Sequence, residues 1–354
     1  MSEFALIPSM VVAFAVTAAF MFALRPVAQS VGLVDRPGGR KSHIGDVPII
    51  GGIAMFVGMF TGIHILTGVD AGVSSVMIAS LILVTIGVTD DKYTVPAPVR
   101  FVAQISAVLI MVYGANLVLY ELGDPFGAGL ISLGPFSLIF TMAVALTMIN
   151  AYNLIDGADG LAGTLALIAL LALAAVSGVA SVHAGIALTV CSAIIGYLLF
   201  NFPLSWNRSV RSFMGDAGST LLGFTVVWVA LGISQGPERM ISPVHCLWFA
   251  SIPIYDCLTC FVRRSLAGKS PFTPGRDHFH HTLLRGGLKV RQTLALLTGL
   301  QAVYAVLGLL GHFAGVPDAA MFAAWSVLGL SQRFVVKAIA KHWRGSRLRR
   351  HRTI

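Results

Sequence analysis

The chain has 354 residues, of which 56% are hydrophobic and only 11% are charged, and its mean hydropathy is +0.84. About a quarter of the residues in a soluble domain are charged, so this composition excludes a soluble globular protein and predicts an integral membrane protein. The formal net charge of +9 comes from 24 lysines and arginines against 15 acidic residues.

Apolar stretches of about 20 residues, the length that crosses a bilayer, follow one another along almost the whole chain. Eleven can be drawn, at approximately 4–24, 47–67, 73–89, 101–120, 132–150, 160–179, 183–200, 217–235, 243–262, 294–314 and 317–337. The expected fold is therefore an all-α polytopic membrane protein with about 11 transmembrane helices. We expect residues 1–354 to form a single integral-membrane domain with a basic tail at 338–354.

The distribution of positive charge predicts the orientation of these spans. If the N-terminus lies outside, 23 of the 24 lysines and arginines fall in inner loops or the tail, and only Arg239 falls outside. Positive charge marks the cytoplasmic side, so we expect a periplasmic N-terminus and a cytoplasmic C-terminus. The basic tail favours contact with anionic lipid headgroups, and nucleic acid is not expected as a partner.

The first inner loop contains Lys41 and leads into Gly51-Gly52 at the start of the second span. Lys41 is as consistent with an anionic ligand as with simple anchoring at the headgroups. The two glycines predict close packing of the second span against a neighbour, because small residues let helices approach one another.

Asp90 and Asp91 end the third span, and Arg100 begins the fourth on the same side. Adjacent carboxylates raise each other's pKa unless a cation lies nearby. Such a pair can bind Mg²⁺ or supply a general base, and a solvated helix end is the structural alternative. Arg100 is equally consistent with a phosphate ligand and with an interface anchor.

The loop after the fifth span is the most polar segment among the spans, with the sequence Asn150-Ala-Tyr-Asn-Leu-Ile-Asp-Gly-Ala-Asp-Gly. Asn150 and Asn153 share a helix face, and glycines after Asp156 and Asp159 permit tight turns. Four amide or carboxylate side chains within ten residues indicate a binding site rather than a plain connector.

Asp216 begins the eighth span between two glycines, and we expect it to cap that helix while remaining available to a metal ion. The last inner loop contains Arg276 and the run His278-Phe-His-His281. Imidazole and guanidinium groups donate hydrogen bonds to phosphates, which favours a pyrophosphate ligand. A zinc site or a purely structural loop are the alternatives.

Together these motifs resemble the polyprenyl-phosphate N-acetylhexosamine-1-phosphate transferase superfamily, glycosyltransferase family 4. The resemblance covers residues 35 to about 291. It implies that Asn153 and Asp216 ligate Mg²⁺, with Mn²⁺ as the alternative ion. It implies a catalytic role for Asp90, Asp91, Asp156 and Asp159, with Asp90 as the base for the lipid phosphate. The substrate-binding residues it implies are Lys41, Arg100, Asn150, Arg276, His278, His280 and His281.

The resemblance further implies transfer of a sugar 1-phosphate from a UDP-N-acetylhexosamine to undecaprenyl phosphate, with release of UMP. The His-Phe-His-His run is similar to the N-acetylglucosamine branch, so UDP-N-acetylglucosamine is the expected donor. Another UDP-N-acetylhexosamine or phospho-MurNAc-pentapeptide is the alternative. The expected setting is the bacterial inner membrane, with the site facing the cytoplasm, a role in starting surface polysaccharides such as O-antigen, and a homodimer by analogy.

A transporter or ion channel is the competing hypothesis from a different class. Its acidic residues would be distributed across the depth of the membrane to line a pathway. In this chain the five motif aspartates all lie at predicted inner helix ends, which favours the enzyme.

Overall fold

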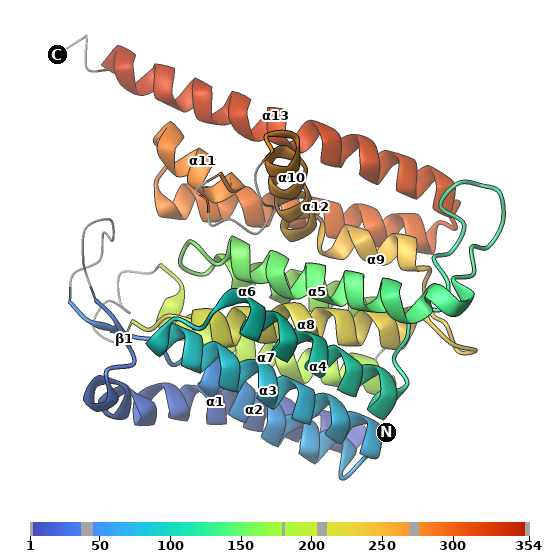
Figure 1. Ribbon diagram of the computed structural model, residues 1–354, viewed down its shortest axis with the longest axis horizontal. Coiled ribbons are helices and arrows are strands. Elements are labelled where there is room, and N and C mark those ends of the chain that lie inside the picture. The colour runs from blue at the N-terminus through green and yellow to red at the C-terminus, as the bar shows by residue number, and fades with distance from the viewer. Residues whose placement is uncertain are drawn as a thin grey trace.

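The computed structural model describes residues 3–36, 45–178, 181–203, 211–268, 275 and 277–350. These residues form a bundle of helices with one short two-stranded sheet (Figure 1). The elements are α1 (Glu3–Val31), β1 (Val34–Asp35), β2 (Val47–Pro48), α2 (Gly51–Thr67), α3 (Ala71–Tyr93), α4 (Ala97–Ala115), η1 (Gly134–Phe136), α5 (Ser137–Ile155), α6 (Leu161–Ser177), α7 (Val182–Asn201), α8 (Gly215–Ser234), α9 (Pro243–Phe249), α10 (Ser251–Leu266), α11 (Phe279–Gly286), α12 (Val290–Phe313) and α13 (Asp318–Arg350).

The all-α polytopic class is confirmed. Within the described ranges, eight helices are long and apolar enough to cross a membrane, and α9 with α10 makes a ninth candidate if the two form one span. The remaining predicted spans coincide with α2 and α6, which are apolar but shorter. A total of eleven spans, and their orientation, therefore stay predictions.

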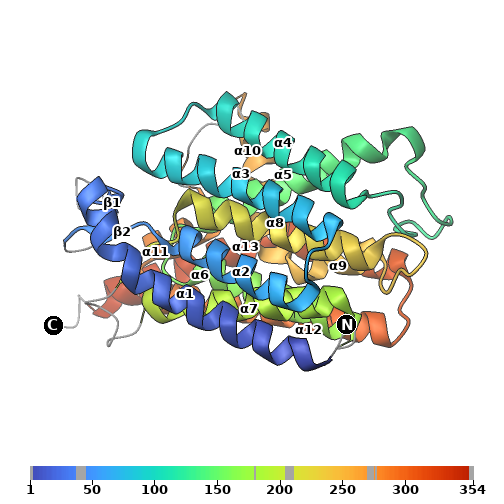
Figure 2. The same ribbon diagram turned by 90° about the horizontal axis from the view of Figure 1, so that it is seen from below.

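Helix α8 packs against α2, α3, α5 and α6 and lies in the middle of these four helices (Figure 2). Small residues make this packing possible. A Cβ atom on Gly52 would collide with the backbone of Gly218, and one on Gly87 would collide with the backbone of Ala217. The close packing predicted for the Gly51-Gly52 pair is thus confirmed, and it draws the start of α8 against α2 and α3.

The predicted span at 243–262 is broken between α9 and α10, which meet at an angle of 90°. The cause is Pro253, which has no N–H to donate to the carbonyl of Phe249 four residues earlier. Gln301 of α12 replaces the missing bonds, because its Nε2 donates to the carbonyls of Phe249 (2.8 Å) and Trp248 (3.2 Å). Its Oε1 accepts the N–H of Ile252 at 2.9 Å. Pro8 and Pro26 lie inside α1 without interrupting it, so a proline in an apolar stretch did not by itself predict the break.

The entry to α8 is held by backbone pairing with the entry to α2. The N–H of Phe213 donates to the carbonyl of Pro48 at 2.9 Å, and the N–H of Gly51 returns a bond to the carbonyl of Phe213 at 3.0 Å. The sheet of β1 and β2, helix α11 and the end of α13 lie at one end of the bundle, opposite the N-terminus (Figure 1). Asp216 is therefore fixed at the same end as the other polar motifs.

Candidate active site

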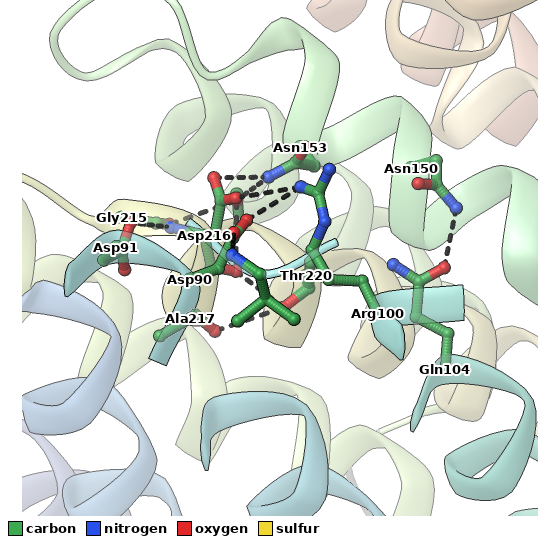
Figure 3. A network of polar contacts seen from close by, with 12 residues as sticks. Asp90, Asp91, Arg100, Gln104, Asn150, Asn153, Gly215, Asp216, Ala217 and Thr220 are labelled. Carbon is green, nitrogen blue, oxygen red and sulfur yellow. Dashed lines mark hydrogen bonds and ion pairs between the residues drawn. The ribbon is translucent and has the colours of Figure 1, made fainter. Parts of the chain in front are cut away.

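The ends of α3 and α5 and the starts of α4 and α8 converge at this end of the bundle and carry one polar network (Figure 3). Asp90 lies in the last turn of α3, and its side chain is only 8% exposed. Its Oδ2 accepts a bond of 2.8 Å from Nη1 of Arg100, and its Oδ1 accepts one of 2.6 Å from the N–H of Val95. A left-handed residue, Thr94, turns the chain between the two helices, so Asp90 and Arg100 face each other across a tight turn.

Asp216 lies at the second position of α8 and receives two partners from other helices. Nδ2 of Asn153 donates to its Oδ1 at 2.8 Å, and Nη1 of Arg100 lies 3.5 Å from its Oδ2. Arg100 thereby bridges Asp90 and Asp216 (Figure 3). A guanidinium between two carboxylates neutralises charges that would otherwise repel each other.

Asp91 caps the start of α8, a role that the sequence had suggested for Asp216. Oδ1 of Asp91 accepts the backbone N–H of Asp216 at 2.9 Å, whereas the side chain of Asp216 makes no capping bond. The expectation for Asp216 was wrong because α8 begins one residue earlier, at Gly215, so Asp216 lies inside the helix. Oδ2 of Asp91 is buried and has no hydrogen-bond partner among the described residues.

The loop after α5 holds Asp156 and Asp159 in different environments. Withdrawal from water, together with the negative charges of Asp216, Asp91 and Asp159, raises the pKa of Asp156 to about 8. Asp159 instead forms an ion pair with Arg211. In the sequence Arg211 is only one of the basic loop residues, and no spacing signal links two residues 52 positions apart.

Asn150 is directed away from the acidic network. Its Nδ2 donates to Oε1 of Gln104 at 2.9 Å and to the carbonyl of Leu146 at 2.7 Å (Figure 3). No bond described here joins it to Asn153 one turn later or to the aspartates. Its assignment to substrate binding therefore stays a prediction.

The histidine run lies against the Asp156–Asp159 loop. His280 of α11 is fully buried, and a Cβ atom on Gly157 would collide with its ring. Burial lowers the pKa of His280 well below its ordinary value, and the neighbouring His281 and His278 lower it further. Both of its ring nitrogens lack hydrogen-bond partners within the described ranges. Arg276 and Lys41 lie outside the described residues.

The donor set fits a hard divalent cation such as Mg²⁺, which prefers oxygen ligands. Asp216 supplies a carboxylate, and Asn153 supplies a side-chain amide whose Nδ2 donates to Oδ1 of Asp216. Their role as metal ligands stays a prediction from the resemblance. The buried, unpartnered Oδ2 of Asp91 adds a further oxygen next to Asp216. An orphaned buried carboxylate oxygen is costly unless a cation compensates it, which supports a metal ion here.

Comparison with known proteins gives consistent matches. The model of a family described as glycosyl transferase family 4 matches residues 73–234, the segment from α3 to α8. The undecaprenyl-phosphate alpha-N-acetylglucosaminyl 1-phosphate transferase of Escherichia coli O157:H7 is 35% identical over 328 residues, which are 92% of this chain and 89% of that protein. Proteins of the same name from Yersinia pestis (34% over 338 residues, 94% and 91% covered) and Pasteurella multocida (35% over 353 residues, 96% and 95% covered) are also similar. Because the similarity extends over nearly the whole length, the chain belongs to glycosyl transferase family 4.

Proposed function

We propose that this protein transfers N-acetylglucosamine 1-phosphate from UDP-N-acetylglucosamine to undecaprenyl phosphate, giving undecaprenyl-diphospho-N-acetylglucosamine and UMP. The observation that carries the proposal is the network of Asp90, Arg100, Asn153 and Asp216, built by four helices at one end of an apolar bundle. The names of relatives that match nearly the whole chain support the same reaction.

The reaction joins two anions and needs a site that lowers their repulsion. A phosphate oxygen of the lipid attacks the β-phosphorus of the UDP-sugar. The bond from that phosphorus to the bridging oxygen breaks, and UMP leaves with the electron pair. Asp90 accepts any proton that remains on the attacking phosphate, and Arg100 orients its carboxylate at 2.8 Å. Direct attack requires only these groups and a cation.

Mg²⁺, held by Asn153 and Asp216, would supply positive charge that stabilises the diphosphate and the departing UMP. Arg100 contributes a fixed positive charge beside the same two aspartates. Asp156 and Asp159 lie next to the histidine run, whose residues the resemblance assigns to substrate binding. At a pH below its raised pKa, the carboxyl group of Asp156 is neutral, so it adds no further negative charge near the UDP-sugar.

The proposed setting is the bacterial inner membrane with the site facing the cytoplasm. The lipid acceptor then reaches the site sideways from the bilayer, and the water-soluble donor arrives from the cytosol. The positive-inside distribution supports this orientation, because the polar network lies in loops on the basic side. Initiation of a surface polysaccharide such as O-antigen follows from the lipid-linked product.

The test is UMP release by protein purified in detergent with undecaprenyl phosphate, Mg²⁺ and a panel of UDP-sugars. We expect UMP with UDP-N-acetylglucosamine, and we expect its loss when EDTA is added. Phospho-MurNAc-pentapeptide and other N-acetylhexosamine donors serve as competitors in the same panel. Folded protein that releases no UMP from any of these donors would contradict the proposal.

A further inference from the structure

A buried aspartate outside the acidic network holds the histidine run in place. Asp256 lies in α10 and is 1% exposed. Its Oδ2 is 2.8 Å from Nδ1 of His278, and its Oδ1 accepts the backbone N–H of Phe279 at 2.7 Å. Both carboxylate oxygens are thus engaged at the first turn of α11, where free N–H groups favour an anion.

The contact with Nδ1 determines how His278 presents its other nitrogen. A carboxylate that accepts from Nδ1 fixes the ring orientation and favours the doubly protonated ring. Burial alone lowers the pKa of His278, but the hydrogen bonds and charges of Asp256 and Cys260 outweigh burial and raise it to about 9. His278 is therefore an imidazolium at neutral pH and can donate a hydrogen bond from Nε2.

The arrangement continues from His278 into the candidate active site. The rings of His278 and His280 are parallel within 7°, with centroids 6.0 Å apart. His280 in turn packs on Gly157, between Asp156 and Asp159. The position of Asp256 therefore sets the position of α11 relative to the loop of Asp156 and Asp159, for which the resemblance implies a catalytic role.

We propose that Asp256 is a positioning residue for the transfer reaction, which anchors α11 and presents His278 as a hydrogen-bond donor to the anionic diphosphate substrate. This inference rests on the proposed function. The nearest basic residue on the helix of Asp256 is Arg263, whose partner is Asp277. The fold supplies a partner 22 residues away instead.

The same cluster has the composition of a metal site, since ligand atoms of Asp256, Cys260 and His278 all lie within 4.8 Å of one another. These atoms already form hydrogen bonds with one another. Nδ1–H of His278 donates to Oδ2 of Asp256 at 2.8 Å, and Sγ of Cys260 lies 3.5 Å from the same nitrogen. A metal ion would have to displace that proton. The positioning role needs no such change, so the observations favour it.

The experiment compares Asp256→Asn with Cys257→Ser, a control one residue along the same helix. Asn keeps an oxygen for the N–H of Phe279 but removes the charge that keeps His278 protonated. We expect UMP release by Asp256→Asn to fall by about 10–100-fold, the usual effect of losing a group that orients a ligand. We also expect the alkaline limit of its pH–rate profile to move to lower pH. Among the residues that the structure describes, the ionisable groups in contact with His278 include Asp256, Cys260, His280 and His281.

A purely structural role would lower activity in proportion to the folded fraction and leave the alkaline limit unmoved, and that result would overturn the inference. Thermal unfolding in detergent measures the folded fraction.

If Asp256→Asn does not fold, the same measurements are made on Asp256→Glu, whose alkaline limit should lie closer to that of the wild type. Stoichiometric zinc in the purified wild type, lost in Cys260→Ser, would also overturn it. If the wild type and the Cys257→Ser control both release no UMP, the proposed function is refuted. In that case nitrogen NMR of His278 still tests whether Asp256 keeps its ring protonated.

Discussion

The backbone N–H of Asp216 donates a hydrogen bond of 2.9 Å to Oδ1 of Asp91, which ties the first turn of α8 to the last turn of α3. The two residues are 125 positions apart in the chain. This bond places the carboxylate of Asp216 beside Asp90, Arg100 and Asn153, so the network depends on a helix cap supplied from another helix.

Replacement of Asp91 should separate its capping role from its charge. Asp91→Ala removes the cap of α8, and we expect it to lower the free energy of unfolding by about 1–2 kcal/mol. Asp91→Asn keeps an oxygen acceptor, so we expect near-native stability together with strongly reduced UMP release. Thermal unfolding and the UMP assay measure the two effects. Equal stability of both variants would contradict the capping role.

Loss of Arg100 should leave Asp90 and Asp216 unneutralised. We expect Arg100→Ala to reduce UMP release by roughly 100-fold, because the carboxylates of Asp90 and Asp216 would lose the guanidinium that holds them in place, and misplacing reacting groups has an effect of that order. Arg100→Lys should recover only part of the activity, since an ammonium cannot donate to both carboxylates in the same geometry. The matched control is Arg239→Ala, whose ion pair with Glu121 is at the opposite end of the bundle. A similar loss in that control would contradict a specific role.

Asn153 and Asp216 should determine the metal requirement. We expect Asn153→Ala to raise the Mg²⁺ concentration needed for half-maximal UMP release, because it removes one oxygen ligand. Asp90→Asn should instead lower the maximal rate at an unchanged Mg²⁺ requirement, because Asp90 is proposed as a base. The assay is a Mg²⁺ titration after EDTA treatment. If both variants shifted the requirement equally, the separate assignments would fail.

Asp156 should make the protein less stable as pH rises. Its pKa is raised from 3.8 to about 8 in the folded state, so the folded protein holds a proton that the unfolded chain has released between these values. The stabilisation is complete below about pH 3.8 and is lost as pH rises through about 8. In EDTA, the unfolding temperature should fall between pH 5 and pH 8.5, and Asp156→Asn should flatten that fall. Asp70→Asn, at an exposed cap of α3, should not change it.

The break between α9 and α10 should depend on Gln301. Gln301→Leu removes the side-chain partner of the Phe249 carbonyl and of the Ile252 N–H inside the bundle. The carbonyl of Trp248 loses one of its two donors and keeps the hydroxyl of Ser251 at 3.1 Å. We expect a loss of about 1–3 kcal/mol in the free energy of unfolding. The control is Thr298→Ala one turn away, whose hydroxyl bonds only to carbonyls of its own helix. An unfolding temperature for Gln301→Leu as high as that of the control would contradict the role of Gln301.

The sequence predicted much of the candidate site because membrane proteins restrict where charge can lie. Carboxylates next to apolar spans are costly unless something compensates them, so Asp90, Asp91 and Asp216 were conspicuous. The partnership of Asp159 with Arg211 and that of Asp256 with His278 were not predictable. Both depend on how distant helix ends meet, and neither pair has a periodic spacing in the chain.

The membrane class, the approximate positions of the helices and the set of polar residues with which the family is recognised could all be predicted from the sequence. Those features follow from local composition, because the bilayer penalises every unpaired polar group along a span. Three features depend instead on how distant parts of the chain pack together: the residue that caps α8, the break of a span at Pro253, and the aspartate that holds His278. These outcomes arise from close packing at glycine contacts and from hydrogen bonds between helices, and local sequence does not encode either of them.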